Sequence, residues 1–258
     1  MKKIALVTGA SSGIGKELAR IHAMNGGDLI VVARREEELE NIKLDLEKTY
    51  GIKVLVLSLD LSIYGAGTAL VNEINKKGFE VEYLMNNAGF GGYGEFYQRD
   101  IEKEKEMIRL NITACVEITH GILQGMIKRK KGKILNTAST AGFLPGPLQA
   151  VYFASKAFVV SFSQAIDQEV KPYGITVTAL CPGPVETEFQ NVAGMKDNRL
   201  FSKRAKSARY VALIGYRAML KGRLVAITEK SLSVFINGIL SFMPRRSVLK
   251  LIQKLQKQ

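Results

Sequence analysis

Tyr152 and Lys156 are the side chains of this sequence best suited to acid–base chemistry, because they lie four positions apart in the stretch YFASK. On a helix, this spacing puts the phenol and the ammonium on one face. A free phenol has a pKa of about 10 and is a poor catalyst at neutral pH unless a positive charge stabilises the phenolate. Such a pair can arise by chance in a lysine-rich chain, but Ser139 ends the preceding predicted strand and favours a site.

A glycine-rich stretch, TGASSGIG at 8–15, follows the first predicted strand and leads into a helix predicted to begin near Ile14. Because Gly9, Gly13 and Gly15 have no Cβ, the turn can be tight and a ligand can approach the backbone closely. The free amides and the positive end of the helix dipole suit a pyrophosphate. A plain strand-to-helix turn is the alternative, but the position in the first β-α unit favours dinucleotide binding.

Two arginines, Arg34 and Arg35, follow the second predicted strand, where NAD-binding proteins often carry an acidic residue against the ribose hydroxyl. Arginine favours the 2′-phosphate of NADP(H) instead, so NAD(H) is the less favoured cofactor. The alternative is a solvated pair that offsets the acidic residues 36–38.

Two further strand ends carry candidate cofactor contacts. Asp60 follows the third predicted strand and could bind an adenine amino group or cap the next helix near Ser62. The fourth predicted strand ends in NNAG at 86–89, where Ala88 and Gly89 are small enough for the backbone to lie beside a ribose. A simple turn is the alternative for NNAG.

Seven short β-branched runs alternate with longer amphipathic stretches. Strands joined by helices run parallel, and a parallel sheet needs helices on both faces. The order predicts one doubly wound, Rossmann-type α/β domain, with a mostly seven-stranded parallel sheet and ligands beyond the carboxyl ends of its strands. The predicted strands are 4–7, 29–32, 54–57, 83–85, 133–136, 176–180 and 224–227, and the predicted helices include 16–24, 36–50, 66–77, 101–130 and 152–173.

Across residues 1 to about 190, these motifs resemble the short-chain dehydrogenase/reductase family in order and spacing. The motifs are TGASSGIG, NNAG, Asn111, Ser139, Tyr152 with Lys156, and the Pro182-Gly183 turn. The resemblance implies an NADP(H)-dependent oxidoreductase, similar to ketoacyl, steroid and carbonyl reductases, that moves a hydride between nicotinamide and a carbonyl or secondary alcohol. The alternative is a catalytically silent NADP-binding regulatory or interaction protein, which would tolerate loss of the tyrosine.

The same resemblance implies the roles of individual residues. Tyr152 would be the proton donor and acceptor, Lys156 would bind the nicotinamide ribose, and Ser139 would hold the substrate oxygen. Asn111 would support a water chain, and Thr187 would contact the carboxamide. The expected cofactor-binding residues are Gly9, Ser11, Ser12, Gly13, Ile14, Gly15, Arg34, Arg35, Asp60, Leu61, Asn87, Ala88, Gly89, Tyr152, Lys156, Pro182, Gly183, Val185 and Thr187.

The remaining composition favours a cytoplasmic protein without a metal. Cys115 and Cys181 lie apart in apolar stretches, as is typical of a reducing compartment, and His22 and His120 lie singly in helix-like patterns. The apolar run 4–7 is too short for a signal peptide. The run 234–243 is interrupted by polar residues and is far shorter than the roughly 20 residues of a membrane-spanning helix.

The net charge of +13 lies entirely in the last quarter of the chain: residues 1–195 carry 22 basic and 22 acidic side chains, whereas residues 196–258 carry 15 basic and two acidic ones. The basic stretch 196–209 could bind the phosphate group of an acyl carrier or of coenzyme A. Nucleic acid is disfavoured because no aromatic residues alternate with the basic ones.

Residues 230–258 are expected to be a basic amphipathic extension of the catalytic domain, residues 1–229. Its predicted helix, 248–255, could pack on the core or on a sister subunit of a dimer or tetramer. It could instead settle on an anionic membrane as a peripheral contact. For the substrate, Tyr93, Phe96, Tyr97 and Phe189 suggest an apolar pocket, although ordinary loop packing explains them equally well.

Overall fold

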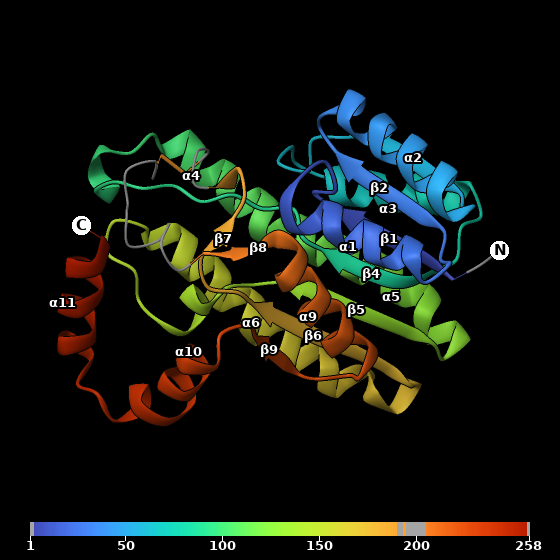
Figure 1. Ribbon diagram of the computed structural model, residues 1–258. Coiled ribbons are helices and arrows are strands. Elements are labelled where there is room, and N and C mark those ends of the chain that lie inside the picture. Colours follow the sequence, from blue (N-terminus) through green and yellow to red (C-terminus); the bar gives the residue numbers. More distant parts are fainter. Residues whose placement is uncertain (1–2, 190–192, 195–204, 257–258) are drawn as a thin grey trace.

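The computed structural model describes residues 3–189, 193–194 and 205–256. Its centre is a parallel sheet of seven strands in the order β3-β2-β1-β4-β5-β6-β9 (Figure 1). Every predicted strand is present, and the predicted doubly wound Rossmann-type fold is confirmed. The strands are β1 (Ile4–Thr8), β2 (Leu29–Ala33), β3 (Val54–Ser58), β4 (Val81–Asn86), β5 (Gly132–Thr137), β6 (Ile175–Cys181) and β9 (Val225–Ile227).

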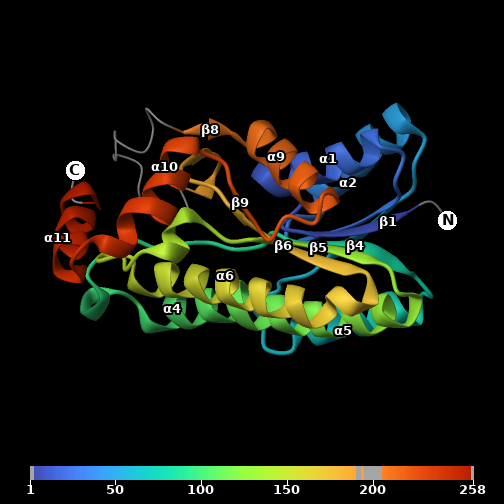
Figure 2. The same cartoon turned by 90° about the horizontal axis from the view of Figure 1, so that it is seen from below.

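Helices cover both faces of this sheet (Figure 2). One face carries α1 (Gly13–Met24), α2 (Glu36–Tyr50) and α9 (Ala208–Leu220), and the other carries α3 (Ala66–Lys76), α4 (Ile101–Ile108), α5 (Cys115–Arg129) and α6 (Ala150–Val170). Two short strands, β7 (Val185–Glu186) and β8 (Lys206–Ser207), form a separate small sheet. The C-terminal helices α10 (Lys230–Val234) and α11 (Arg245–Gln256) lie together at one end of the molecule.

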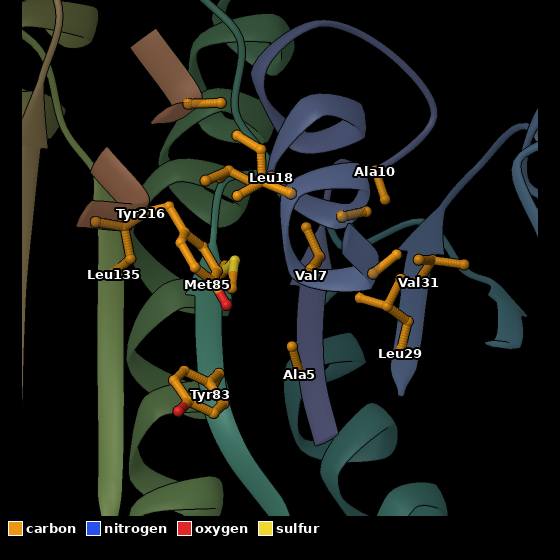
Figure 3. Packing of buried hydrophobic residues seen from close by; sticks show 14 of the residues in the cluster. Ala5, Val7, Ala10, Leu18, Leu29, Val31, Tyr83, Met85, Leu135 and Tyr216 are labelled. Atoms are coloured by element: carbon orange, nitrogen blue, oxygen red, sulfur yellow. The ribbon is translucent and has the colours of Figure 1, made fainter. Parts of the chain in front are cut away.

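The side chains of β1 alternate between two cores, because neighbouring residues of a strand point to opposite faces. Ala5 and Val7 pack into the core beneath α1, α2 and α9 (Figure 3). Ile4 and Leu6 pack into the core beneath α3 and α5. Burial on both faces explains why the run 4–7 is apolar without interruption, since a central parallel strand has no face in water.

The stretch 101–130 was predicted as one helix, but the structure interrupts it with a π-helical turn at Arg109–Ala114. The turn carries Asn111, whose amide oxygen accepts a hydrogen bond from the Phe90 backbone nitrogen at 3.1 Å. The Asn111 amide nitrogen donates to the Phe90 carbonyl at 3.0 Å. The turn therefore holds the loop that follows β4, and apolar periodicity does not reveal such a local change of helix type.

One histidine and both cysteines are buried inside the domain. His22 is buried and bridges the Lys3 carbonyl and the Tyr216 hydroxyl, both at 2.9 Å, and burial lowers the pKa of its imidazole. Both cysteines are free and buried. Within residues 3–189, 193–194 and 205–256, no group of three or more potential metal ligands occurs, and no helix is long and apolar enough to cross a membrane.

A ladder of buried polar side chains joins β4 and β5 to the helices beneath them. The Asn86 amide nitrogen donates to the Thr119 hydroxyl and to the Asn136 amide oxygen, both at 2.9 Å. Asn136 donates in turn to the Ser163 hydroxyl at 2.9 Å. A buried amide without partners is costly, so this ladder fixes the two strands against α5 and α6 directly below their carboxyl ends.

We predict that Asn136→Ala lowers the free energy of unfolding by about 2–3 kcal/mol, because it leaves donors and acceptors of the ladder without partners. Urea denaturation followed by circular dichroism measures the change. Asn41→Ala, on the exposed face of α2, is the matched control and should change the free energy by less than about 0.5 kcal/mol. Equal losses in the two variants would contradict a structural role for the ladder.

Candidate active site

A cavity of about 700 Å³ lies beyond the carboxyl ends of the strands, where a doubly wound sheet is expected to bind its ligands. Nearly all of the predicted site residues line it. These are Gly9, Ser11, Ser12, Gly13, Ile14, Arg34, Arg35, Asp60, Leu61, Asn87, Ala88, Gly89, Ser139, Tyr152, Lys156, Pro182, Gly183, Val185 and Thr187. The exceptions are Gly15 and Asn111, which lie behind the cavity wall.

The glycine turn brings the backbone of β1 against the end of β4. Gly9 and Gly13 have φ angles of +66° and +53°, a region that favours glycine. A Cβ on Gly15 would lie 2.2 Å from the Gly9 carbonyl oxygen and 2.6 Å from the Asn87 amide nitrogen. Gly15 therefore permits close packing of the turn, while the amino end of α1 faces the cavity.

Thr8 and Asn87 fix this arrangement with hydrogen bonds. The Thr8 hydroxyl accepts from the backbone nitrogens of Asn87 and Ala88, both at 3.0 Å. The Asn87 side chain donates to the Thr8 carbonyl at 3.2 Å and accepts from the Thr137 hydroxyl at 3.3 Å. The ends of β1, β4 and β5 are thereby held together at one edge of the cavity.

The two arginines after β2 contact groups at the cavity rather than the acidic start of α2. Arg35 donates to the Ser11 hydroxyl at 3.2 Å and forms an ion pair with Glu188 at 2.9 Å. The pKa of the Glu188 carboxyl is lowered, mainly by the hydrogen bond that it accepts from Arg35. The Glu188 carboxylate thus binds some of the Arg35 N–H donors that a phosphate could also bind.

Asp60 bonds to Ser62 in a turn, but it does not cap the following helix, which was one of its two predicted roles, because α3 begins at Ala66 with Gly65 as its N-cap. Its carboxylate accepts from the Ser62 backbone nitrogen at 2.9 Å and from the Ser62 hydroxyl at 2.7 Å. Arg34 lies 3.9 Å from the other carboxylate oxygen. Burial raises the pKa of Asp60, but the bonds from Ser62 and the charge of Arg34 outweigh it, so that its pKa lies below the usual value.

Ser139, Tyr152 and Lys156 meet where β5 ends and α6 begins. The Ser139 hydroxyl lies near enough to Tyr152 to lower the pKa of the phenol; it donates to the Pro182 carbonyl at 3.3 Å and accepts from the Ala141 backbone nitrogen at 3.1 Å. The Lys156 ammonium lies 5.8 Å from the centre of the Tyr152 ring and donates to the Thr137 carbonyl at 2.8 Å. The spacing of the YFASK stretch therefore does place both side chains on one face of α6.

The electrostatics of this group differ from the expectation that the ammonium makes the phenol acidic. Burial raises the pKa of Tyr152 to about 12, and the hydrogen bond with Ser139 lowers it only in part. Burial also lowers the pKa of Lys156 to about 8. The cost of removing charge from water dominates, and the phenol is held in its protonated form.

Asn111 acts from behind the cavity wall. Besides its two bonds to Phe90, its amide nitrogen donates to the Ser155 hydroxyl at 3.0 Å. Ser155 lies beside Lys156 on α6, so Asn111 joins the loop after β4 to the helix that carries the tyrosine and the lysine. These bonds fix the loop and the helix relative to each other, and the water chain expected at Asn111 stays a prediction.

The C-terminal part of the chain supplies a cavity wall that the sequence did not predict. Ile252, Leu255 and Gln256 of α11 line the cavity, together with Glu229 and Leu232. The amphipathic pattern of 248–255 predicted the helix but gave no indication of its packing partner. The end of α11 is held there because the hydroxyl of Tyr93 donates to the Gln256 carbonyl at 2.7 Å.

Of the aromatic residues expected near a substrate, Phe189 alone lines the cavity. Its ring centre lies 5.3 Å from that of Tyr152. Phe96 and Tyr97 are instead 57% and 78% exposed. The basic stretch 196–209 falls largely outside the described residues, which resume at 205.

Comparison with known proteins agrees with this geometry. A family model described as short chain dehydrogenase matches residues 3–198. A very-long-chain 3-oxoacyl-CoA reductase from Anas platyrhynchos is 31% identical over 260 residues, which cover 98% of this chain and 80% of the relative. A reductase of the same name from Phaeosphaeria nodorum is 36% identical over 192 residues, which cover 73% of this chain. That alignment spans only 56% of the fungal relative.

Among solved structures, a short-chain dehydrogenase from Sphingobium yanoikuyae in complex with NADPH superimposes with a TM-score of 0.83 at 29% identity. The superposition covers 94% of this chain and 96% of that one. The family model spans most of the sequence, and the fold, the glycine turn and the Ser139, Tyr152 and Lys156 cluster all fit it. The chain therefore belongs to the short-chain dehydrogenase family.

Proposed function

We propose that this oxidoreductase uses NADP(H) to interconvert a carbonyl group and a secondary alcohol, with Tyr152 as the proton donor and acceptor. The observation that supports it best is the convergence of Ser139, Tyr152 and Lys156 in the cavity that the glycine turn also lines. A binding protein without turnover has no need of a phenol, a hydroxyl and an ammonium grouped there. The silent regulatory protein is therefore the less favoured alternative.

The residues of the cavity fit a dinucleotide phosphate. The amino end of α1 and the tight glycine turn suit the pyrophosphate, and a Cβ on Gly9 would lie 2.9 Å from the Ala88 Cα. Arg34 and Arg35 would hold the 2′-phosphate, with Ser11 beside them, and Lys156 the nicotinamide ribose. The NADPH bound to the Sphingobium yanoikuyae relative supports the same choice. When bound, NADPH supplies the hydride for reduction.

The protein's own residues account for the proton. A substrate carbonyl oxygen bound beside Ser139 and Tyr152 would accept hydrogen bonds from both hydroxyls. Reduction turns this oxygen into an alkoxide, which is a stronger base than a phenolate even when burial holds the phenol pKa at about 12. The proton therefore passes from the Tyr152 oxygen to the substrate oxygen, and the nearby charge of Lys156 stabilises the phenolate that remains.

We propose a ketone with a long apolar group as the substrate, in particular a 3-oxoacyl thioester of coenzyme A or of an acyl carrier. The names of the duck and fungal relatives support the thioester. The apolar side chains of Leu144, Phe189, Leu232, Ile252 and Leu255 on the cavity wall support the apolar group.

We further propose that residues 230–258 extend the catalytic domain 1–229, since α11 completes the same cavity. A cytoplasmic homo-oligomer, dimer or tetramer, is proposed for the assembly. Exposed apolar side chains on the α4 and α6 face, Ile108 at 41% and Phe158 at 38%, support an interface there.

We predict that Tyr152→Phe lowers kcat for ketone reduction at least about 100-fold, because the ring keeps its packing but loses the proton. NADPH affinity, measured by fluorescence titration, should be unchanged. Lys156→Ala should weaken both turnover and NADPH binding. Loss of NADPH binding in the Tyr152→Phe variant, with turnover retained, would contradict the assignment.

The pH dependence should report Lys156. Its pKa is lowered to about 8, so the charged form is present at neutral pH and is lost as the pH rises. We expect kcat/KM for NADPH, which reports the free enzyme, to fall above about pH 8. In Lys156→Arg the guanidinium stays charged, so the variant should lack this decline. The same decline in both proteins would assign it to another group.

Cofactor choice should depend on the two arginines. We predict that Arg34→Ala and Arg35→Ala each lower kcat/KM for NADPH by about 10- to 100-fold, the usual effect of losing a hydrogen bond to a charged group. The value for NADH should change little, because NADH has no 2′-phosphate. Arg20→Ala is the control, since Arg20 bonds to Glu17 and Asp45 away from the cavity. Equal losses with both cofactors would exclude a 2′-phosphate site.

A further inference from the structure

The segment 230–256, here named the C-terminal cap, exposes large apolar side chains to solvent. Phe242 is 88% exposed and Val234 is 66% exposed. On α11, Leu249 and Leu251 are 37% and 40% exposed. Large apolar side chains gathered on one segment commonly mark an interaction surface.

The C-terminal cap is also strongly basic. The sequence contains six basic and no acidic residues after Glu229. Arg245, Arg246, Lys250 and Lys254 are exposed, and within the ranges that the structure describes none of them forms an ion pair. Positive charge and apolar side chains on one short segment are the features of helices that lie in a membrane surface.

The position of the cap links this surface to the cavity. Figures 1 and 2 show α10 and α11 at the end of the molecule that is remote from α2 and the amino terminus. Ile252, Leu255 and Gln256 of α11 line the cavity, whereas Lys250 and Lys254 of the same helix are exposed. One face of α11 therefore encloses the substrate space, and another remains free for a partner.

We propose that the C-terminal cap docks this protein on the surface of an anionic lipid bilayer. α11 would lie in the plane of the bilayer, with its lysines and arginines against the lipid phosphates and Phe242 inserted at the boundary of the acyl chains. The outer face of α11 would then contact the lipid while its inner face lines the cavity. The cavity would thus lie beside the bilayer, where the proposed substrate with a long apolar group is most concentrated.

Charge decides between this partner and a second copy of the chain. Two caps pressed together would bring like charges into contact, which costs several kcal/mol in general. An acidic carrier protein matches the charge, but it does not account for exposed Phe242 and Val234. An anionic bilayer matches both features.

The test is co-sedimentation of the full chain with vesicles of phosphatidylcholine alone or with phosphatidylglycerol added. We expect binding to the anionic vesicles, weakened by salt. Each basic residue near an anionic surface contributes about fivefold to binding, so Lys250→Gln with Lys254→Gln should weaken it about 25-fold. Phe242→Ser should also weaken it. The matched control is Lys48→Gln with Lys76→Gln, exposed lysines on α2 and α3.

Turnover of a water-soluble ketone with NADPH, measured on the same variants, should be unchanged, because none of these side chains lines the cavity. This readout separates the two proposals: a wild-type chain that binds vesicles but reduces no ketone would contradict the proposed function alone. Three results would overturn docking. These are equal binding to neutral and anionic vesicles, equal losses of binding in the control variant, and no binding to anionic vesicles. In the last case, dimer formation through the cap or capture of an acidic carrier would identify the other partner.

Discussion

The geometry of the cavity depends on two hydrogen bonds that the Thr8 hydroxyl accepts from the backbone nitrogens of Asn87 and Ala88, at the end of β4. They join the carboxyl ends of β1 and β4, the two strands between which the order of the sheet reverses direction along the chain. Only glycine at position 15 lets the turn after β1 pack this closely. The amino end of α1 then lines the same cavity as Ser139 and Tyr152.

Burial, rather than the charge of the lysine, has the largest effect on the pKa values of Tyr152 and Lys156. Removing the phenol and the ammonium from water disfavours the charged form of each, so the pKa of Tyr152 rises and that of Lys156 falls. A protonated phenol is the form needed to reduce a ketone. The Lys156 ammonium donates to the Thr137 carbonyl at 2.8 Å, and this bond holds the side chain in place.

Most of the fold and the core of the site could be predicted from the sequence, because both follow from local patterns. Apolar runs predicted all seven strands, and most of the residues singled out after the strands line the cavity. The failures concern contacts between distant segments. The π-helical turn at Asn111 depends on Phe90, the position of Gly15 depends on Asn87, and the pKa of Tyr152 depends on how deeply the completed fold buries it.

The position of α11 shows why periodicity alone could not predict this wall of the cavity. Val248, Ile252 and Leu255 recur at helical spacing and would serve equally well against a core, a sister subunit or a lipid surface. The structure turns Ile252 and Leu255 to the cavity and leaves Leu249 and Leu251 partly in solvent. Since the helix carries apolar side chains beyond those that the cavity wall uses, packing within the chain explains only part of its sequence, and the rest calls for a partner outside it.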